Sequence, residues 1–157
     1  MEQYVRPTPE YSLPENFDPQ AFLRHKGNLI WPIENGVVTD SFGIHKHPLF
    51  KWILVNNNGI DISTDPNAAV RSVYDGVVAE IISIPGDHQA VLVSHGNYFS
   101  LYSNLISVNV QRGELLKSGQ MIGSVFTDAE NSSVGLLKFQ IWNEQNKLDP
   151  LEWLEKK

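Results

Sequence analysis

From Leu29 to its end, the chain consists of short segments in which apolar and polar residues alternate, separated by turn-forming residues. Alternation with a period of two is typical of strands that bury one face, and no helical period longer than about three turns follows residue 30. The pattern predicts a mainly all-β fold, an antiparallel β-sandwich or small open barrel. The expected strands are 37–42, 59–63, 70–74 continuing through 77–84, 90–94, 99–105, 121–126 and 137–142.

The first 28 residues differ from this β-rich part. Residues 1–16 hold three prolines among polar residues, which favours an extended arm. Asp18-Pro19 resembles a helix start, with Asp18 as N-cap and Pro19 at the first helical position, so a short helix is expected over 19–25, with Gly27 as its stop. We therefore divide the chain into an arm with a short helix (1–28) and a β domain (29–157). A helical turn over 148–154, with Trp153 and Leu154 packed inward, is expected to close the domain.

Composition excludes several classes of protein. A chain of 157 residues with 41% hydrophobic residues is long enough to bury one core. Its formal charge of −6 argues against a nucleic-acid partner. No apolar run reaches the roughly 18 residues that cross a bilayer, so no membrane insertion is expected. The absence of cysteine excludes disulfides, a thiol nucleophile, an iron–sulfur cluster and a Cys-ligated zinc site.

Two stretches place polar side chains together on strand faces. In the last expected strand, Leu136, Lys138 and Gln140 share one face, while the alternate residues form a core face. Asn57 and Asp61 also share a face, but a fully extended chain would hold them about 13 Å apart. They reach a common centre only if the chain bends between them, which Gly59 permits.

An ordered set of short motifs resembles the LytM domain of lysostaphin-type zinc endopeptidases, which cut peptide cross-links in peptidoglycan. The resemblance covers about Leu29 to Leu154, and three of its segments are most similar to EnvC-type murein hydrolase activators, whose LytM domain is degenerate. The motifs are Trp31-Pro32, Ser41-Phe42-Gly43 with His47-Pro48, Asn56 to Ile62, Asp75-Gly76-Val77-Val78, Ser94-His95-Gly96-Asn97, Leu101 to Leu105, Gly119 to Gly123, Phe139 to Trp142 and Asp149-Pro150.

The resemblance implies where a zinc site would lie. The family's first His, its Asp and its last His fall on Asn57, Asp61 and Lys138, and two further catalytic histidines fall on Asn104 and Leu136. Only Asp61 is retained. Asparagine is a poor zinc ligand, leucine is none, and an ammonium repels a dication. We therefore expect no zinc cofactor and no peptide hydrolysis, and we predict instead that Lys138 pairs with Asp61, since an uncompensated buried carboxylate is costly.

The resemblance also implies a function and a partner. In EnvC-type proteins the vacated groove binds and activates a periplasmic cell-wall amidase, so an N-acetylmuramoyl-alanine amidase is the expected partner and the periplasm the expected compartment. The mode would be an amphipathic helix laid into the groove. Peptidoglycan is a further candidate partner. The expected groove residues are Asn57, Asn58, Asp61, Tyr102, Asn104, Leu136 and Lys138, with His45 and His47 at the rim.

Other interpretations remain open at this point. The domain could be an active metallopeptidase with a displaced ligand set, such as Asp61 with His45 or His47, or a peptidoglycan-binding module. Asp61 could also simply cap a turn, and Lys138 could be a solvated strand residue. The start of the chain has no signal pattern, and the coiled coil of EnvC-type proteins is lacking, so either a cytoplasmic chain or an excised C-terminal domain is expected. The sequence does not show whether the arm or the helix covers the groove.

Overall fold

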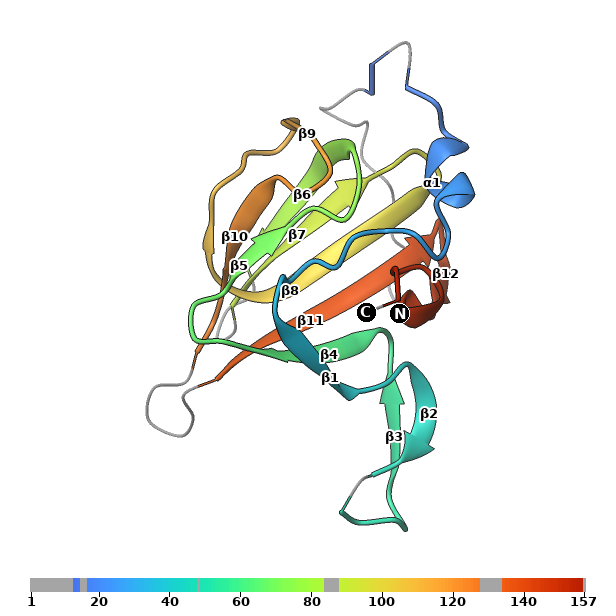
Figure 1. Ribbon diagram of the computed structural model, residues 1–157, viewed down its shortest axis with the longest axis vertical. Coiled ribbons are helices and arrows are strands. Elements are labelled where there is room, and N and C mark those ends of the chain that lie inside the picture. The colour runs from blue at the N-terminus through green and yellow to red at the C-terminus, as the bar shows by residue number, and fades with distance from the viewer. Residues whose placement is uncertain (1–12, 15–16, 48, 84–87, 128–133, 157) are drawn as a thin grey trace.

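The computed structural model describes residues 13–14, 17–47, 49–83, 88–127 and 134–156. They form a mainly antiparallel β fold, which confirms the predicted fold class. Figure 1 shows the elements. The strands are β1 (Gly36–Asp40), β2 (Gly43–Lys46), β3 (Leu54–Asn57), β4 (Ile60–Thr64), β5 (Ala69–Arg71), β6 (Gly76–Ser83), β7 (Gln89–Ser94), β8 (Tyr98–Val108), β9 (Leu115–Leu116), β10 (Met121–Val125), β11 (Gly135–Asn143) and β12 (Asn146–Leu148). The helices are α1 (Ala21–Arg24) and a 3₁₀ turn, η1 (Pro150–Glu152).

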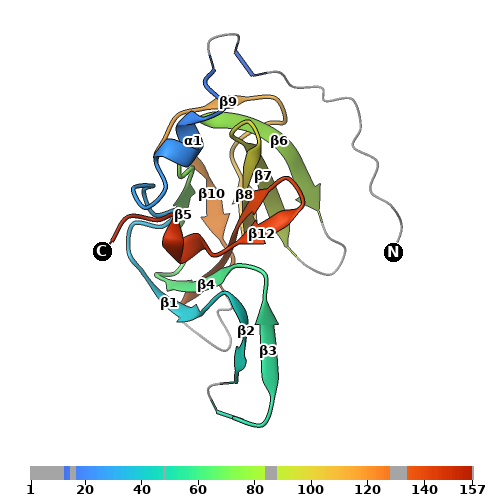
Figure 2. The ribbon, with the colours of Figure 1, turned by 90° about the vertical axis from the view of Figure 1, so that its right-hand side faces the viewer.

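Ten of these strands form one sheet, in the order β1-β4-β11-β8-β7-β6-β9. Strand β10 pairs with both β8 and β5, and β12 pairs with β11. Within the described part of the chain, the end strands β1 and β9 do not pair with each other. Strands β2 and β3 form a separate two-stranded sheet that projects from the β1 end of the molecule in both views (Figures 1 and 2).

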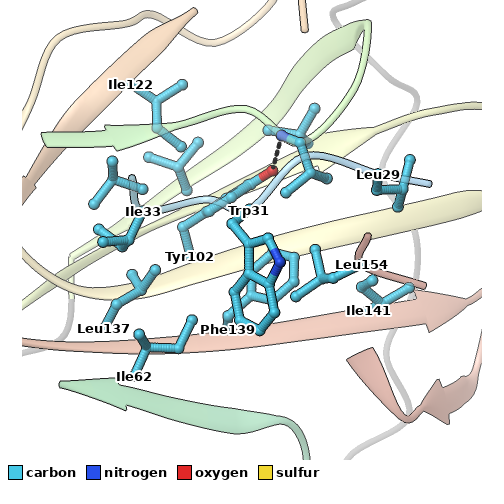
Figure 3. Close-up of a cluster of buried hydrophobic side chains, with 14 of the residues drawn as sticks. Leu29, Trp31, Ile33, Ile62, Tyr102, Ile122, Leu137, Phe139, Ile141 and Leu154 are labelled. Carbon is cyan, nitrogen blue, oxygen red and sulfur yellow. Dashed lines mark hydrogen bonds between the residues drawn. The ribbon is translucent and has the colours of Figure 1, made fainter. Parts of the chain in front are cut away.

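The buried side of the large sheet carries the core. In β11, every second residue from Gly135 to Ile141 is buried, as period-two alternation predicts. The segment that precedes β1 adds Leu29, Trp31 and Ile33 to the same core (Figure 3). Tyr102 of β8 is fully buried there, and its hydroxyl accepts a hydrogen bond from the Val73 amide at 3.0 Å.

Helix α1 is shorter than predicted but is anchored in the core. It spans a single turn, and the Asp18 carboxylate accepts from the Gln20 amide at 2.9 Å just before it. Phe22 is fully buried and stacks on His95 and Trp153, with ring centroids 4.5 and 5.2 Å away. Trp153 itself is buried, as predicted for the closing turn. The helix and the β2–β3 hairpin lie at opposite ends of the molecule (Figures 1 and 2).

Several strands escaped the sequence analysis. Strands β2, β3, β9 and β12 are two to four residues long, too short for periodicity to show. The stretch expected to run on from residue 70 through 84 is divided into β5 and β6 by a turn at Ser72, whose hydroxyl donates to the Tyr74 carbonyl at 2.7 Å. No helix in the described ranges is both long and apolar enough to span a bilayer.

His95 is a buried polar residue just after β7 that links the turn before β6 to β8. Its Nδ1 lies 2.7 Å from the Asp75 carbonyl and its Nε2 lies 2.8 Å from the Ser100 hydroxyl, which is 2.9 Å from the hydroxyl of Tyr102. Burial lowers the pKa of His95 to about 4. A neutral ring fits these contacts, because Nδ1–H donates to the carbonyl while Nε2 accepts from Ser100.

We predict that His95 makes the fold acid-sensitive. In the unfolded chain His95 takes up a proton near pH 6.5, whereas in the folded chain His95 stays neutral until the pH reaches about 4. Stability therefore falls as the pH drops from 6.5 to 4, by about 3 kcal/mol from this residue. Urea unfolding of wild type and His95→Gln at pH 7.0, 5.5 and 4.5 checks this. The variant should show the shallower pH dependence, and parallel curves would refute the assignment.

Candidate functional site

Three polar residues lie in a row across neighbouring strands. Asp40 of β1 is paired with Asp61 of β4, and Asp61 is paired with Lys138 of β11. Directly paired residues in a sheet point to the same side. Asp61 is half-buried between the buried neighbours Ile60 and Ile62, so the row lies on the side of the sheet opposite the core.

A β-bulge brings Asp40 into this row. The register on β1 shifts between Val38 and Asp40, so that Thr39 is an extra residue opposite β4. A bulge re-aims the side chains that follow it. Without it, Thr39 would face Asp61 and Asp40 would turn toward the core side. The bulge thus places two carboxylates side by side.

The bend between β3 and β4 brings Asn57 to the same place. The Asn57 side-chain oxygen accepts from the Gly59 amide at 3.1 Å, which closes the bend. Gly59 is required because a Cβ there would meet the Phe139 carbonyl oxygen at 2.0 Å. It is not among the glycines with positive φ, so close packing against β11, and not the conformational freedom that we expected, explains this glycine. The predicted meeting of Asn57 with Asp61 is confirmed.

Nitrogen donors face all four carboxylate oxygens of Asp40 and Asp61. The Asn57 Nδ2 donates to Asp40 Oδ2 at 3.0 Å and to Asp61 Oδ1 at 3.4 Å. His45 Nε2 lies 2.5 Å from Asp40 Oδ1, and Lys138 Nζ lies 3.5 Å from Asp61 Oδ2. We call these five residues (Asp40, His45, Asn57, Asp61 and Lys138) the Asp61 cluster. The predicted Lys138–Asp61 ion pair is confirmed.

The Lys138–Asp61 and His45–Asp40 contacts differ in exposure. The Lys138 side chain is 53% exposed and the Asp61 side chain 17%, so solvent screens their attraction and the pair contributes at most about 1 kcal/mol. His45 and Asp40 are 26% and 25% exposed. Nδ1 of His45 also faces an acceptor, the Gly43 carbonyl at 3.1 Å, so a ring carrying both protons satisfies both contacts.

His47 does not join His45. Its Nδ1 accepts from the Leu49 and Phe50 amides at 3.0 and 3.1 Å, and its ring lies against Phe50 with centroids 5.2 Å apart. His47 therefore shapes the tip of the β2–β3 hairpin. Both histidines were predicted to line the rim of the groove, and only His45 reaches the Asp61 cluster.

The other predicted groove residues near the cluster make structural contacts. Asn104 has a φ of +70°, which asparagine tolerates better than most residues, and its Nδ2 donates to the Leu136 carbonyl at 2.8 Å. Leu136 is half-buried on the same face of β11 as Lys138. Asn58 is exposed and accepts from Lys147 Nζ at 2.8 Å. Asn104 and Leu136 lie next to the cluster, while Asn58 lies toward β12.

Tyr102 is the one predicted groove residue that belongs to the core. It is paired with Phe139, whose ring lies 5.2 Å from its own, and both side chains are fully buried. Its neighbour Ser103 is the residue of β8 that is paired with Lys138. The sequence analysis assigned the right strand but the wrong face, so Tyr102 does not line the surface around Asp61.

The arrangement does not fit a catalytic zinc ion. Zinc needs imidazole, thiolate or carboxylate ligands, whereas Asn57 turns its NH₂ group, and Lys138 its ammonium, toward Asp61. In the described ranges, no group of three or more His, Cys, Asp or Glu side chains could hold a metal ion. The site is therefore a closed network of donors and carboxylates.

Asp40 is the member of the cluster that sequence reasoning missed. It lies within a stretch predicted as strand, Val37 to Phe42, where alternation alone assigns it a face. The bulge that changes this face leaves no sequence signal. The available hint was its position two residues before Phe42-Gly43, at the point where the main sheet gives way to the hairpin.

Comparison with known proteins agrees with this fold. Residues 55–150 match the model of Peptidase family M23. The protein NMB1333 of Neisseria meningitidis serogroup B is 32% identical over 137 residues, which are 85% of this chain and 21% of that protein. The cell division protein DipM of Caulobacter vibrioides is 29% identical over 102 residues, 64% of this chain and 16% of that protein. The chain thus spans about a fifth of the length of these curated relatives.

Solved structures show the same fold at lower identity. A zinc containing peptidase from Vibrio cholerae superposes with a TM-score of 0.67 at 24% identity, over 83% of this chain and 41% of that one. A chain in the crystal structure of the SpoIIIAH and SpoIIQ complex superposes with a TM-score of 0.66 at 21% identity, over 81% of this chain and all of that one. With the family model matching more than half of its length, the chain belongs to peptidase family M23.

Proposed function

We propose that this domain is a non-catalytic member of the family that binds a cell-wall amidase in the cell envelope and activates it. One observation carries the proposal: each carboxylate oxygen of Asp40 and Asp61 faces a nitrogen donor of this chain's own. We propose that these protein groups take the place of the family's metal ion.

The domain lacks the histidine side chains that the family uses for peptide hydrolysis. The two positions that the family resemblance assigns to further catalytic histidines hold Asn104 and Leu136. The Asn104 amide already donates to the Leu136 carbonyl, and leucine transfers no proton. His45, the nearest imidazole, is held against Asp40 and Gly43. Among the described residues around the Asp61 cluster, we identify no group free to activate a water molecule.

A protein partner fits what remains on this face. The half-exposed Lys138 offers a charged donor and Leu136 an apolar contact, the combination that an amphipathic helix uses in helix-in-groove recognition. Two comparisons support a binding role: DipM is named a cell division protein, and a chain of the SpoIIIAH and SpoIIQ complex has the same fold within a protein–protein assembly.

Activation would follow from competition for one helix. If a helix of the amidase restrains its own active site, binding of that helix to the surface around Lys138 shifts the amidase toward its open state. The shift is as large as the difference in affinity of this domain for the two states. A catalytic group on the activator is not needed.

We predict that the charge of Lys138 decides amidase activation. Lys138→Glu places a third carboxylate beside Asp40 and Asp61, and Lys138→Met keeps the stem without the charge. Both should lower amidase activity on purified sacculi, the first by roughly tenfold or more. Release of soluble murein fragments measures this, with circular dichroism to confirm folding.

Lys117→Glu is the matched control, because Lys117 is exposed near β9, outside the Asp61 cluster. It should activate like wild type. Equal activation by wild type and both Lys138 variants would contradict the proposed role. Release of fragments by the domain alone would indicate an active endopeptidase instead.

We also predict that two substitutions install a zinc site. Asn57 and Lys138 both reach Asp61, at 3.4 and 3.5 Å, so Asn57→His with Lys138→His supplies the missing imidazoles. After dialysis against zinc buffer, elemental analysis should find about one zinc per double variant, far less in either single variant, and none above background in wild type. Stoichiometric zinc in wild type would refute the proposed loss.

A further inference from the structure

The β2–β3 hairpin carries an unusual charge for this chain. Between Asp40 and Asp61 there is no acidic residue, although the chain has 18 of them, and the stretch contains Lys46 and Lys51. With ten of the twelve Lys and Arg and all Asp and Glu outside it, the rest of the chain has a formal charge of −8. The hairpin is therefore a basic projection on an acidic domain.

The same hairpin exposes a concentration of large apolar side chains. Trp52 and Leu49 at the tip are 79% and 78% exposed, and Ile44 and Leu54 on the strands are 70% and 68% exposed. Among the described residues, the hairpin provides six of the fourteen exposed large hydrophobics. We call these six residues the hairpin surface: Ile44, Leu49, Phe50, Trp52, Ile53 and Leu54.

The hairpin surface is held in a defined shape. The Ile53 amide donates to the Phe50 carbonyl at 2.8 Å, the His47 amide donates to the Ile53 carbonyl at 2.8 Å, and the rings of Phe50 and Trp52 meet edge to face at 5.4 Å. The strand residues alternate, so Ile44 and Leu54 face outward while His45 and Asn57 face the Asp61 cluster. A preformed apolar patch of this kind marks an interaction site.

The charge of the hairpin and of the rest of the domain indicates which kind of partner binds the hairpin surface. A lipid bilayer with anionic headgroups would attract two lysines by only about 1 kcal/mol each, while it repels the acidic remainder of the domain. A second copy facing hairpin to hairpin would oppose Lys46 and Lys51 to themselves, and a head-to-tail contact would have to close into a ring or continue as an open filament. An acidic protein segment meets neither obstacle.

We infer that the hairpin surface is a docking site for a partner protein's amphipathic segment, one with apolar side chains flanked by Asp or Glu. Its apolar residues pack on Trp52 and Leu49, and its carboxylates meet Lys46, which is paired with Leu54, and Lys51 at the tip. The inference goes beyond the proposed function, because it concerns a second surface and stands whether or not the partner is an amidase.

A synthetic amphipathic peptide with a leucine face and glutamate flanks tests the inference by calorimetry, with a lysine-flanked peptide of the same apolar face as comparison. The glutamate peptide should bind wild type, more weakly at high salt, and the lysine peptide should not. Leu49→Ser with Trp52→Ser should lower affinity roughly tenfold or more. The matched control, Ile106→Ser with Leu115→Ser, removes two exposed apolar side chains elsewhere (52% and 56% exposed) and should bind like wild type.

Equal binding by the hairpin variant and wild type, or no binding of the glutamate peptide, would overturn the inference. Pelleting of wild type but not of the hairpin variant with anionic phospholipid vesicles would assign the surface to a membrane. A dimer that the hairpin variant abolishes would assign it to a second copy. Amidase activation is measured on the same samples. Peptide binding without amidase activation supports the inference and contradicts the proposed function. Amidase activation, together with equal peptide binding by wild type and the hairpin variant, supports the proposed function and contradicts the inference.

Discussion

The arrangement of residues around the β1–β4 end of the sheet depends on two carboxylates that lie side by side and must be compensated. Asp40 and Asp61 are brought together by a bulge in β1 and a bend before β4, and both are three-quarters or more buried. Adjacent carboxylates repel each other strongly unless positive charge or N–H donors compensate them. Asn57 bridges the pair, and His45 and Lys138 complete it from either side. The cluster fixes how the hairpin joins the sheet, because two of its donors come from hairpin strands.

The sequence was sufficient for some of these features and insufficient for others. Strand alternation correctly separated Leu136 and Lys138 from the core residues of β11, and the family resemblance correctly brought Lys138 to Asp61. Tyr102 was misplaced because alternation gives two faces without saying which is covered. Only the pairing of Tyr102 with Phe139 settles that question. Asp40 was missed because a bulge inverts the alternation that the prediction relied on.

Gly59 shows a related limit. Its presence correctly indicated that the chain turns between Asn57 and Asp61, but the reason is a carbonyl oxygen of another strand lying where a Cβ would be. Close approaches between segments distant in sequence leave no local signature. The hairpin strands β2 and β3 were missed on similar grounds, since four residues each give too little alternation to stand out.

The surfaces around Lys138 and on the hairpin suit recognition better than chemistry. One face of the hairpin contributes His45 and Asn57 to the cluster, and the other presents apolar side chains to solvent. A partner that contacts both would be oriented by charge at the cluster and bound mainly by apolar contact at the hairpin. The closed network around Asp61 and the exposed apolar side chains of the hairpin are both consistent with the proposed binding role.

Anomalous diffraction at the zinc edge, from crystals of the wild-type protein soaked in excess zinc, tests the central claim most directly. The account predicts that Asn57 and Lys138 still donate to Asp61 and that no anomalous peak lies beside that carboxylate. A peak about 2 Å from an oxygen of Asp61, with Lys138 displaced, would show that the site still holds the family's metal.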